Sequence, residues 1–76
     1  MKPTHHLANH LRQFRRAADI TQEQLAERVN VTRQTIFSIE KGNYTPSVAL
    51  ALQLAKVLGV RVEDLFELRS GANDEP

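Results

Sequence analysis

Arg33, Gln34 and Thr35 are three consecutive polar residues whose types could recognise DNA bases. An arginine can donate two hydrogen bonds to O6 and N7 of guanine, and a glutamine can pair with N6 and N7 of adenine. Such contacts are made when polar residues occupy the first turn of a helix that enters a DNA groove. Ser38 lies one turn after Gln34, so it would face the same groove and could contact a base or a phosphate.

Other polar residues nearby could hold the DNA backbone. Gln22 and Thr32 each stand where a helix is expected to begin, and side chains and free backbone N–H groups at such a position can bind phosphate. Lys41 could add a positive charge to the same surface. Phe37 lies one turn after Arg33 and could either cover a thymine methyl group or pack against the protein itself.

Two short helices joined by a tight turn must position these side chains. Thr21 is a suitable N-cap, and Gln24 can complete a capping box with it. Thr32 is the next suitable N-cap. The first helix is therefore expected over about residues 22–28, and the second over about residues 33–40.

Three further helices complete the predicted fold. Apolar residues recur on one face of a helix that is expected to begin at His5 or Leu7 and to end at Ala18. Residues 48–58 are apolar nearly all round, so they are expected to form the central buried helix, and residues 62–68 a short last helix. The sequence therefore predicts an all-α fold, a compact five-helix bundle that contains a helix-turn-helix.

Over roughly residues 7–68 the pattern resembles the Cro/phage-repressor (XRE-like) family of helix-turn-helix domains. This resemblance implies a lambda-repressor-like fold and a small stand-alone transcriptional regulator that binds double-stranded DNA. Asp19 and Asn30 depart from the family pattern, because they stand where glycine is common. Arg61 departs from it where a capping Ser, Thr or Asp is usual. The matching residues are Leu11, Phe14, Arg15, Gln22, Leu25, Ala26, Val31, Thr32, Ile36, Ile39, Glu40, Gly42, Pro46, Ser47, Leu58, Gly59 and Val60.

The resemblance also implies roles for four residues. Arg15 and Glu40 are expected to form a partly buried ion pair that ties the first helix to the end of the base-reading helix. Asn43 and Tyr44 stand where family members contact the sugar–phosphate backbone, although Tyr44 could equally pack its ring on the domain. Independently of the resemblance, Lys41 is expected to hold, with these two residues, the other DNA strand from the one that Gln22 and Thr32 contact.

A homodimer on a palindromic site is the expected assembly, because one such domain covers only a few base pairs. Its two base-reading helices would then lie about 34 Å apart. The resemblance implies that Leu65, Phe66 or Leu68 could supply the two-fold contact, or these residues could only close the core. A repressor is the expected kind of regulator, and no small-molecule ligand is expected.

Two groups of polar residues near the N-terminus allow more than one interpretation. Arg12 and Arg16 lie one turn apart, away from the apolar face, where they could touch phosphates; a solvated face is the simpler expectation. His6 and His10 have the spacing of a metal site on a helix, and His5 is adjacent. A structural zinc site needs four ligands, and the chain has no cysteine, so neither a metal nor a cofactor is expected.

Length and charge set the domain organisation. The chain has 76 residues and a formal net charge of +1. One DNA-binding domain is expected over residues 7–69, between a flexible N-terminus of residues 1–6 and a disordered acidic tail of residues 70–76. Residues 1–41 hold seven Lys/Arg and four Asp/Glu, so positive charge gathers in the part that contains the helix-turn-helix. No apolar run reaches the ~18 residues of a membrane span, and a cytoplasmic location is expected.

An enzyme is not expected, because the sequence has no cysteine nucleophile and no glycine-rich phosphate loop. The alternative to a DNA-binding regulator is a protein-interaction module, such as the partner-binding domain of an antitoxin. The only candidate for a partner-binding extension would be the short tail from Ser70. The polar residues Arg33 and Gln34 favour DNA, because a partner-binding module would be expected to carry an apolar patch there.

Overall fold

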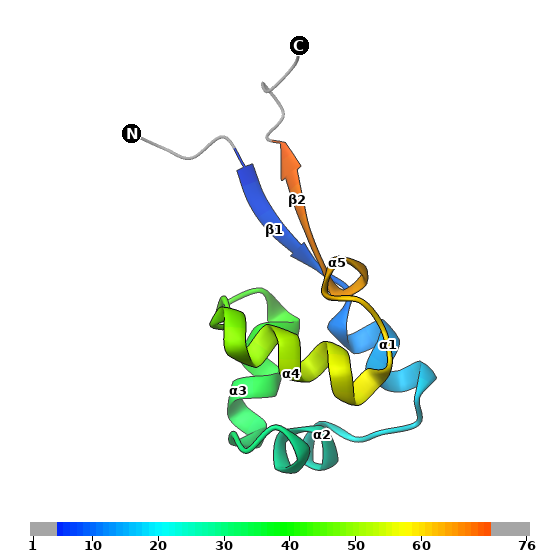
Figure 1. Cartoon of the computed structure of the whole chain (residues 1–76). Helices are drawn as coiled ribbons and strands as arrows, with labels where there is room; N and C mark the ends of the chain where they lie inside the picture. Colours follow the sequence, from blue (N-terminus) through cyan, green and yellow to red (C-terminus); the bar gives the residue numbers. More distant parts are fainter. Residues whose placement is uncertain (1–4, 71–76) are drawn as a thin grey trace.

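In the part of the chain that the structure describes, five α-helices form a bundle, and two short strands project from one end of it (Figure 1). The computed structural model describes residues 5–70. The predicted helical bundle with a helix-turn-helix is confirmed, and a small two-stranded sheet is added to it. Within the described residues, no helix combines the length and the apolar character needed to cross a membrane. In chain order the elements are β1 (His5–Asn9), α1 (Leu11–Ala17), α2 (Gln22–Arg28), α3 (Arg33–Lys41), α4 (Val48–Leu58), α5 (Val62–Leu65) and β2 (Phe66–Ser70).

The two predicted N-caps set the starts of α2 and α3. The hydroxyl of Thr21 accepts a hydrogen bond from the backbone N–H of Gln24 at 3.0 Å, and the side chain of Gln24 accepts from the backbone N–H of Thr21 at 2.9 Å. These reciprocal bonds form the predicted capping box. The hydroxyl of Thr32 likewise accepts from the backbone N–H of Thr35 at 3.2 Å. Local hydrogen bonds therefore place the first residue of each helix.

The three departures from the family pattern have local consequences. Asp19 and Asn30 have φ angles of 60° and 61°, so both adopt the left-handed conformation that glycine adopts more easily. They end the turns that follow α1 and α2. At α5, the carboxylate of Asp64 accepts a hydrogen bond from the backbone N–H of Arg61 at 2.9 Å and caps the helix from within its first turn.

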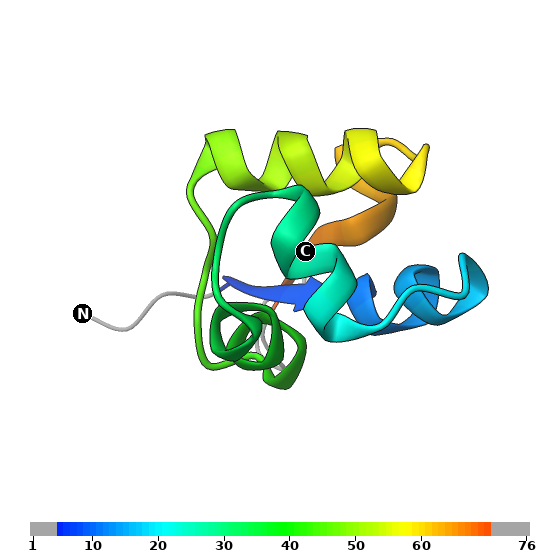
Figure 2. The same ribbon diagram turned by 90° about the horizontal axis from the view of Figure 1, so that it is seen from below.

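One hydrophobic core joins all five helices. α4 lies along one side of the bundle and α3 is seen end-on at the opposite side (Figure 2). The prediction that α4 is the central buried helix is wrong, because Val48 is 76% exposed and Leu52 is 54% exposed. α4 therefore buries one stripe and leaves apolar side chains on the surface. The fully buried large side chains are Leu11, Leu25, Ile36, Ile39, Leu54 and Leu65.

The N-terminal part of the first predicted helix is a strand. Residues 5–9 form β1, and α1 begins only at Leu11, so the helix predicted from His5 or Leu7 is wrong over these residues. The carbonyl oxygen of the Asn9 side chain accepts from the backbone N–H of Leu11 at 3.3 Å, which marks the change from strand to helix.

The last helix is shorter than predicted, for a related reason. It ends at Leu65, and residues 66–70 form β2. β2 pairs antiparallel with β1, and Leu7 lies opposite Leu68. The two strands lie at opposite ends of the sequence, so their hydrogen bonds are invisible to any local pattern of apolar residues. These bonds outweigh the helical spacing that the apolar residues also satisfy.

The predicted flexible ends lie mostly outside the described part of the chain. Residues 1–4 and 71–76 lie outside it. Of the segment predicted to be flexible at the N-terminus, His5 and His6 belong to β1. Ser70, the first residue of the predicted acidic tail, is the last residue of β2.

His10 joins the strand pair to the helices. Its backbone N–H donates to the carbonyl of Leu65 at 2.7 Å, and its Nε2 lies 3.3 Å from a carboxylate oxygen of Glu67. The hydrogen bonds from His10 and then from Arg69 lower the pKa of the Glu67 carboxyl below its usual value. His6 lies in β1 and His10 precedes α1, so these two histidines do not share a helix face. Their spacing of four residues therefore does not have the geometry that was considered for a metal site on a helix.

Candidate nucleic-acid interface

The burial of α3 determines which of its residues face outward. Ile36 and Ile39 are fully buried, so this side of the helix packs into the core. Arg33 and Gln34, at the first two positions of the helix, are exposed, and Phe37 is partly exposed one turn later. α3 therefore presents its N-terminal turn and one long stripe to solvent, as a helix that enters a groove requires.

A chain of hydrogen bonds links the exposed Arg33 to the interior. Its Nη1 donates to the side-chain oxygen of Gln22 at 2.9 Å, and the amide nitrogen of Gln22 donates to Glu40 at 3.0 Å. Gln22 is the first residue of α2 and Arg33 is the first residue of α3, so the hydrogen bond between them joins the two helices of the helix-turn-helix. The side chain of Gln22 therefore holds Arg33 in place.

Glu40 is the centre of this network. Its Oε2 accepts from Nε of Arg15 at 2.6 Å, and its Oε1 accepts from Nη2 of Arg15 at 3.2 Å. The two side chains therefore form a bidentate ion pair. Nη1 of Arg15 also donates to the carbonyl of Ile20 at 2.8 Å. The side chains of Arg15 and Glu40 are only 11% and 4% exposed. α1 is thus tied to the end of α3, as the sequence resemblance implied.

A polar hollow of about 460 Å³ lies between α1, α2 and α3. It follows the stripe of α3 formed by Arg33, Phe37 and Lys41, which are each one turn apart. The ammonium of Lys41 lies 5.7 Å from the centre of the Phe37 ring, within the range of a cation–π contact. Arg12, which the sequence had placed on a solvated face, also lines this hollow.

A second hollow, of about 250 Å³, lies on the other side of the exposed face of α3. It is lined by Gln34, Thr35 and Ser38 from α3 together with Asn43 and Tyr44 from the following loop. Tyr44 is about half exposed, so its ring is available at the surface. Lys41 therefore lines the first hollow, whereas Asn43 and Tyr44 line the second.

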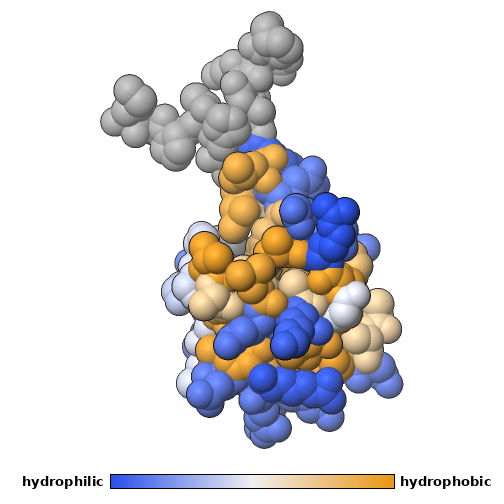
Figure 3. Space-filling view, in the orientation of Figure 1, coloured by the Kyte–Doolittle hydropathy of each residue, from blue (hydrophilic) through white to orange (hydrophobic). Residues whose placement is uncertain are grey.

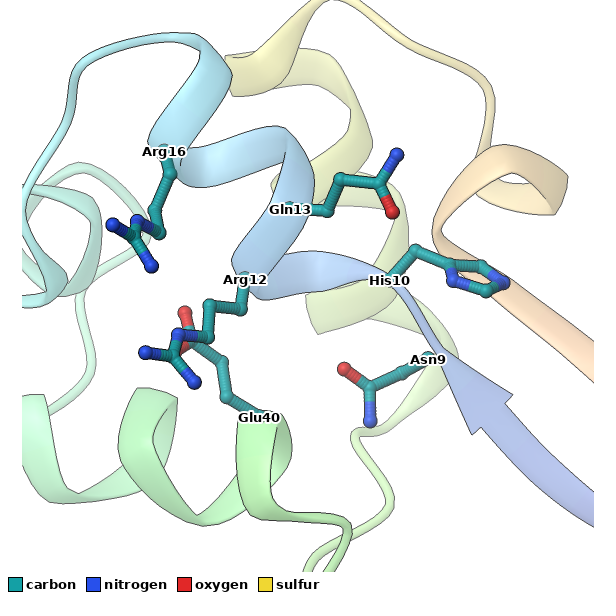
Figure 4. Close-up of a pocket in the computed structure, with 6 residues that line it drawn as sticks. All are labelled: Asn9, His10, Arg12, Gln13, Arg16 and Glu40. Carbon is teal, nitrogen blue, oxygen red and sulfur yellow. The ribbon is translucent and has the colours of Figure 1, made fainter.

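Asn9 has a role that the sequence did not indicate. The amide nitrogen of its side chain donates to the carbonyl of Ile39 at 3.0 Å, so it ties β1 to the last turn of α3. Figure 4 shows Asn9 at the end of β1, on the same side of α1 as Arg12 and Glu40. No signal in the sequence distinguishes Asn9, because the residue falls inside a stretch with helical spacing.

The three residues predicted for a two-fold contact have different environments. Leu65 is fully buried in the core and offers no surface to a partner. Phe66 is partly buried against the core. Leu68 is 72% exposed and lies opposite Leu7, another exposed leucine, on the strand pair.

A profile of the helix-turn-helix family matches residues 11–65, more than half of the chain. The chain belongs to this family, in its Cro/C1-type branch. A 60-residue stretch is 48% identical to an uncharacterized HTH-type transcriptional regulator from Methanocaldococcus jannaschii and covers 79% of this chain and 91% of that protein. A 62-residue stretch is 44% identical to the uncharacterized HTH-type transcriptional regulator YgzD from Bacillus subtilis and covers 82% of this chain and 94% of that protein.

Solved structures show the same fold. The restriction-modification controller protein C.AhdI from Aeromonas hydrophila is 30% identical with a TM-score of 0.67, over 71% of this chain and 78% of that one. The master regulator for biofilm formation SinR, solved in complex with DNA, is 28% identical with a TM-score of 0.65, over 70% of this chain and 86% of that one. The clp gene regulator ClgR from Corynebacterium glutamicum is 31% identical with a TM-score of 0.68, and this chain covers 57% of its length.

These comparisons establish the class of the protein. It is a transcriptional regulator with a helix-turn-helix DNA-binding fold, and it is not an enzyme.

Proposed function

We propose that this protein is a repressor that binds a palindromic DNA site as a homodimer and inserts the first turn of α3 into the major groove. The observation that carries this proposal is the position of Arg33. It is exposed at the first residue of α3, and Gln22 holds its guanidinium. A guanidinium held in place before binding loses less freedom when it pairs with a guanine. The cytoplasm is the proposed location.

Base recognition is assigned to the stripes of α3 that face outward. Arg33 would donate to O6 and N7 of a guanine, and Gln34 would pair with an adenine. Nε2 of Gln34 lies 3.4 Å from the hydroxyl of Ser38, so the amide is already oriented along the helix. Thr35 and Ser38 would contact a base or a phosphate from the same side, and Phe37 would cover a thymine methyl group from the other stripe.

Phosphate contacts are assigned to the edges of this surface. Thr32 caps α3 and Gln22 begins α2, so both residues stand at the N-terminus of a helix, where phosphate can bind. Asn43 and Tyr44 line the hollow on one side of α3, and Lys41 lines the hollow on the other. These contacts would set the position of the protein on DNA and carry no sequence information.

The homodimer is proposed to form through the strand pair. An isolated two-stranded sheet is at best marginally stable in water, and one face of this sheet carries the exposed Leu7 and Leu68. Exposed Val48 and Leu52 continue this apolar surface on α4, and Figure 3 shows hydrophobic residues over α4 and along the strands on the same side of the molecule. A second copy that covered this side would bury these residues.

Selection of bound duplexes from a random library, at about physiological salt, tests the proposed function. The expected result is enrichment of a two-fold symmetric sequence whose half-sites are centred about one helical turn, or 34 Å, apart. Enrichment of a single asymmetric half-site would reject the proposed dimer but would support sequence-specific DNA binding. If only weak, salt-sensitive binding without enrichment were found, sequence-specific regulation would be rejected in favour of a partner-binding module of the antitoxin type.

The variant Leu68→Asn tests the proposed dimer contact. A buried leucine contributes about 1.5–3 kcal/mol, and a two-fold contact contains the residue twice, so the dimer should weaken about 100-fold or more. Sedimentation over a range of protein concentrations measures this change. Arg69→Asn is the matched control, because Arg69 is also exposed but lies on the opposite face of β2. Equal dissociation constants for the two variants would exclude the sheet as the interface.

A further inference from the structure

Arg12 is an exposed cation beside the base-reading helix. It lies in the first turn of α1, and Figure 4 shows its side chain extending from α1 towards α3, on the side of Glu40. Within residues 5–70, its guanidinium has no hydrogen bond and no salt bridge, whereas the nearby Arg15 is fully engaged with Glu40 and Ile20. The guanidinium of Arg12 is therefore available to bind an anion, whereas the guanidinium of Arg15 is held by Glu40 and Ile20.

The hollow that Arg12 lines has an excess of positive charge. Among the described residues, four cationic side chains line it, and Glu40 is the one carboxylate that does so. Arg15 neutralises Glu40, and Arg33 is held by the uncharged Gln22. The remaining cations are Arg12, from α1, and Lys41, from the last turn of α3. Between them the surface is complementary to an anion.

We propose that Arg12 and Lys41 together bind a phosphate group of the DNA backbone, at the edge of the groove that α3 enters. This inference rests on the proposed function. The hollow is continuous with Arg33, so a strand whose base is read by Arg33 would pass over it. α1 then contributes directly to the interface, and the domain holds this strand from both α1 and α3.

Arg16 separates a local contact from a general effect of charge. It is exposed on the same helix one turn after Arg12, and within the described residues its guanidinium also has no hydrogen bond or salt bridge. It lines a neighbouring hollow of about 440 Å³ that Arg12 shares, but not the hollow that contains Arg33 and Lys41. Removing either charge changes the net charge equally, but only Arg12 is placed to touch the phosphate.

The test compares Arg12→Gln with Arg16→Gln, in titrations of the wild-type site and a random duplex at several salt concentrations. One phosphate contact changes the slope of log K against log salt by about 0.9, which corresponds to a loss of about fivefold at ~0.15 M and about 15-fold at ~0.05 M. Arg12→Gln should show both changes on both duplexes. Arg12→Lys should retain most of the affinity, because a phosphate accepts a point charge. Arg16→Gln should lose less than about twofold.

The outcomes distinguish this inference from the proposed function. If Arg12→Gln behaves like the wild type, or if Arg12→Gln and Arg16→Gln lose affinity equally, the proposed contact of Arg12 with phosphate is rejected. The proposal that the protein is a DNA-binding regulator is not affected by that result. If the wild-type protein itself fails to bind duplex DNA, the proposed function is rejected. Circular dichroism of both variants verifies folding, which is expected to be unchanged because both side chains are exposed.

Discussion

Replacing Arg15 by methionine is expected to lower the free energy of unfolding by about 3–5 kcal/mol, since it leaves a buried carboxylate without its charged partner. Glu40 is only 4% exposed, and it would keep a single hydrogen bond, from the uncharged Gln22. This is a large effect for a small domain, whose total stability is of the order of 5–15 kcal/mol. Denaturation by urea, followed by circular dichroism, measures it.

Two controls identify the cause of this loss. Arg16→Met removes an exposed arginine one residue later and should change stability by less than ~0.5 kcal/mol. The double variant Arg15→Met/Glu40→Met should regain much of the lost stability, because a buried ion pair can often be replaced by apolar residues of similar size. A double variant as unstable as Arg15→Met would show that the carboxylate is not the source of the loss.

Replacing Arg33 by alanine is expected to cost about 1–3 kcal/mol in binding to the selected DNA site and to relax the preference at one base pair. The loss should disappear on duplexes in which that base pair is already changed, because the lost contact is specific to the guanine. Competition titrations against a set of single-base variants of the site measure both effects.

Lys41→Ala is the matched control for base recognition. Lys41 lines the same hollow as Arg33, but it is assigned to a phosphate, so its loss should weaken all sequences alike and reduce the salt slope by about one. Gln22→Ala removes the side chain that holds Arg33 and is expected to weaken the same base preference in part. If Arg33→Ala and Lys41→Ala lost affinity equally on every sequence, the assignment of Arg33 to a base would be wrong.

The sequence by itself determined the helix-turn-helix. The spans predicted at residues 22–28, 33–40 and 48–58 agree with α2, α3 and α4, to within one residue at the end of α3. Their starts depend on caps such as Thr21 and Thr32, whose bonds reach only three residues along the chain. Interactions of so short a range can be predicted from neighbouring residues in the sequence alone. The placement of Arg33 at the start of α3 follows from them.

Only the tertiary structure decided the ends of the domain. Residues 5–9 satisfy helical spacing, yet they form a strand because residues 66–70 pair with them across the whole length of the chain. Packing also separates two residues of one predicted helix, because Leu65 ends α5 in the hydrophobic core, whereas Leu68, three residues later on β2, is exposed. Periodicity describes one element at a time, so it cannot show which distant segment an element will meet.

The candidate site divides in the same way. The residue types that could read DNA were visible in α3, and the pairing of Arg15 with Glu40 was implied by resemblance to a family. The distinction between Arg12 and Arg16 was not visible, because both are exposed arginines one turn apart on one helix. It arises from the packing of α1 against α3, which brings one of them, and not the other, to the hollow beside Arg33. The sequence determined which side chains could bind DNA, and three-dimensional packing decided which of them share a surface.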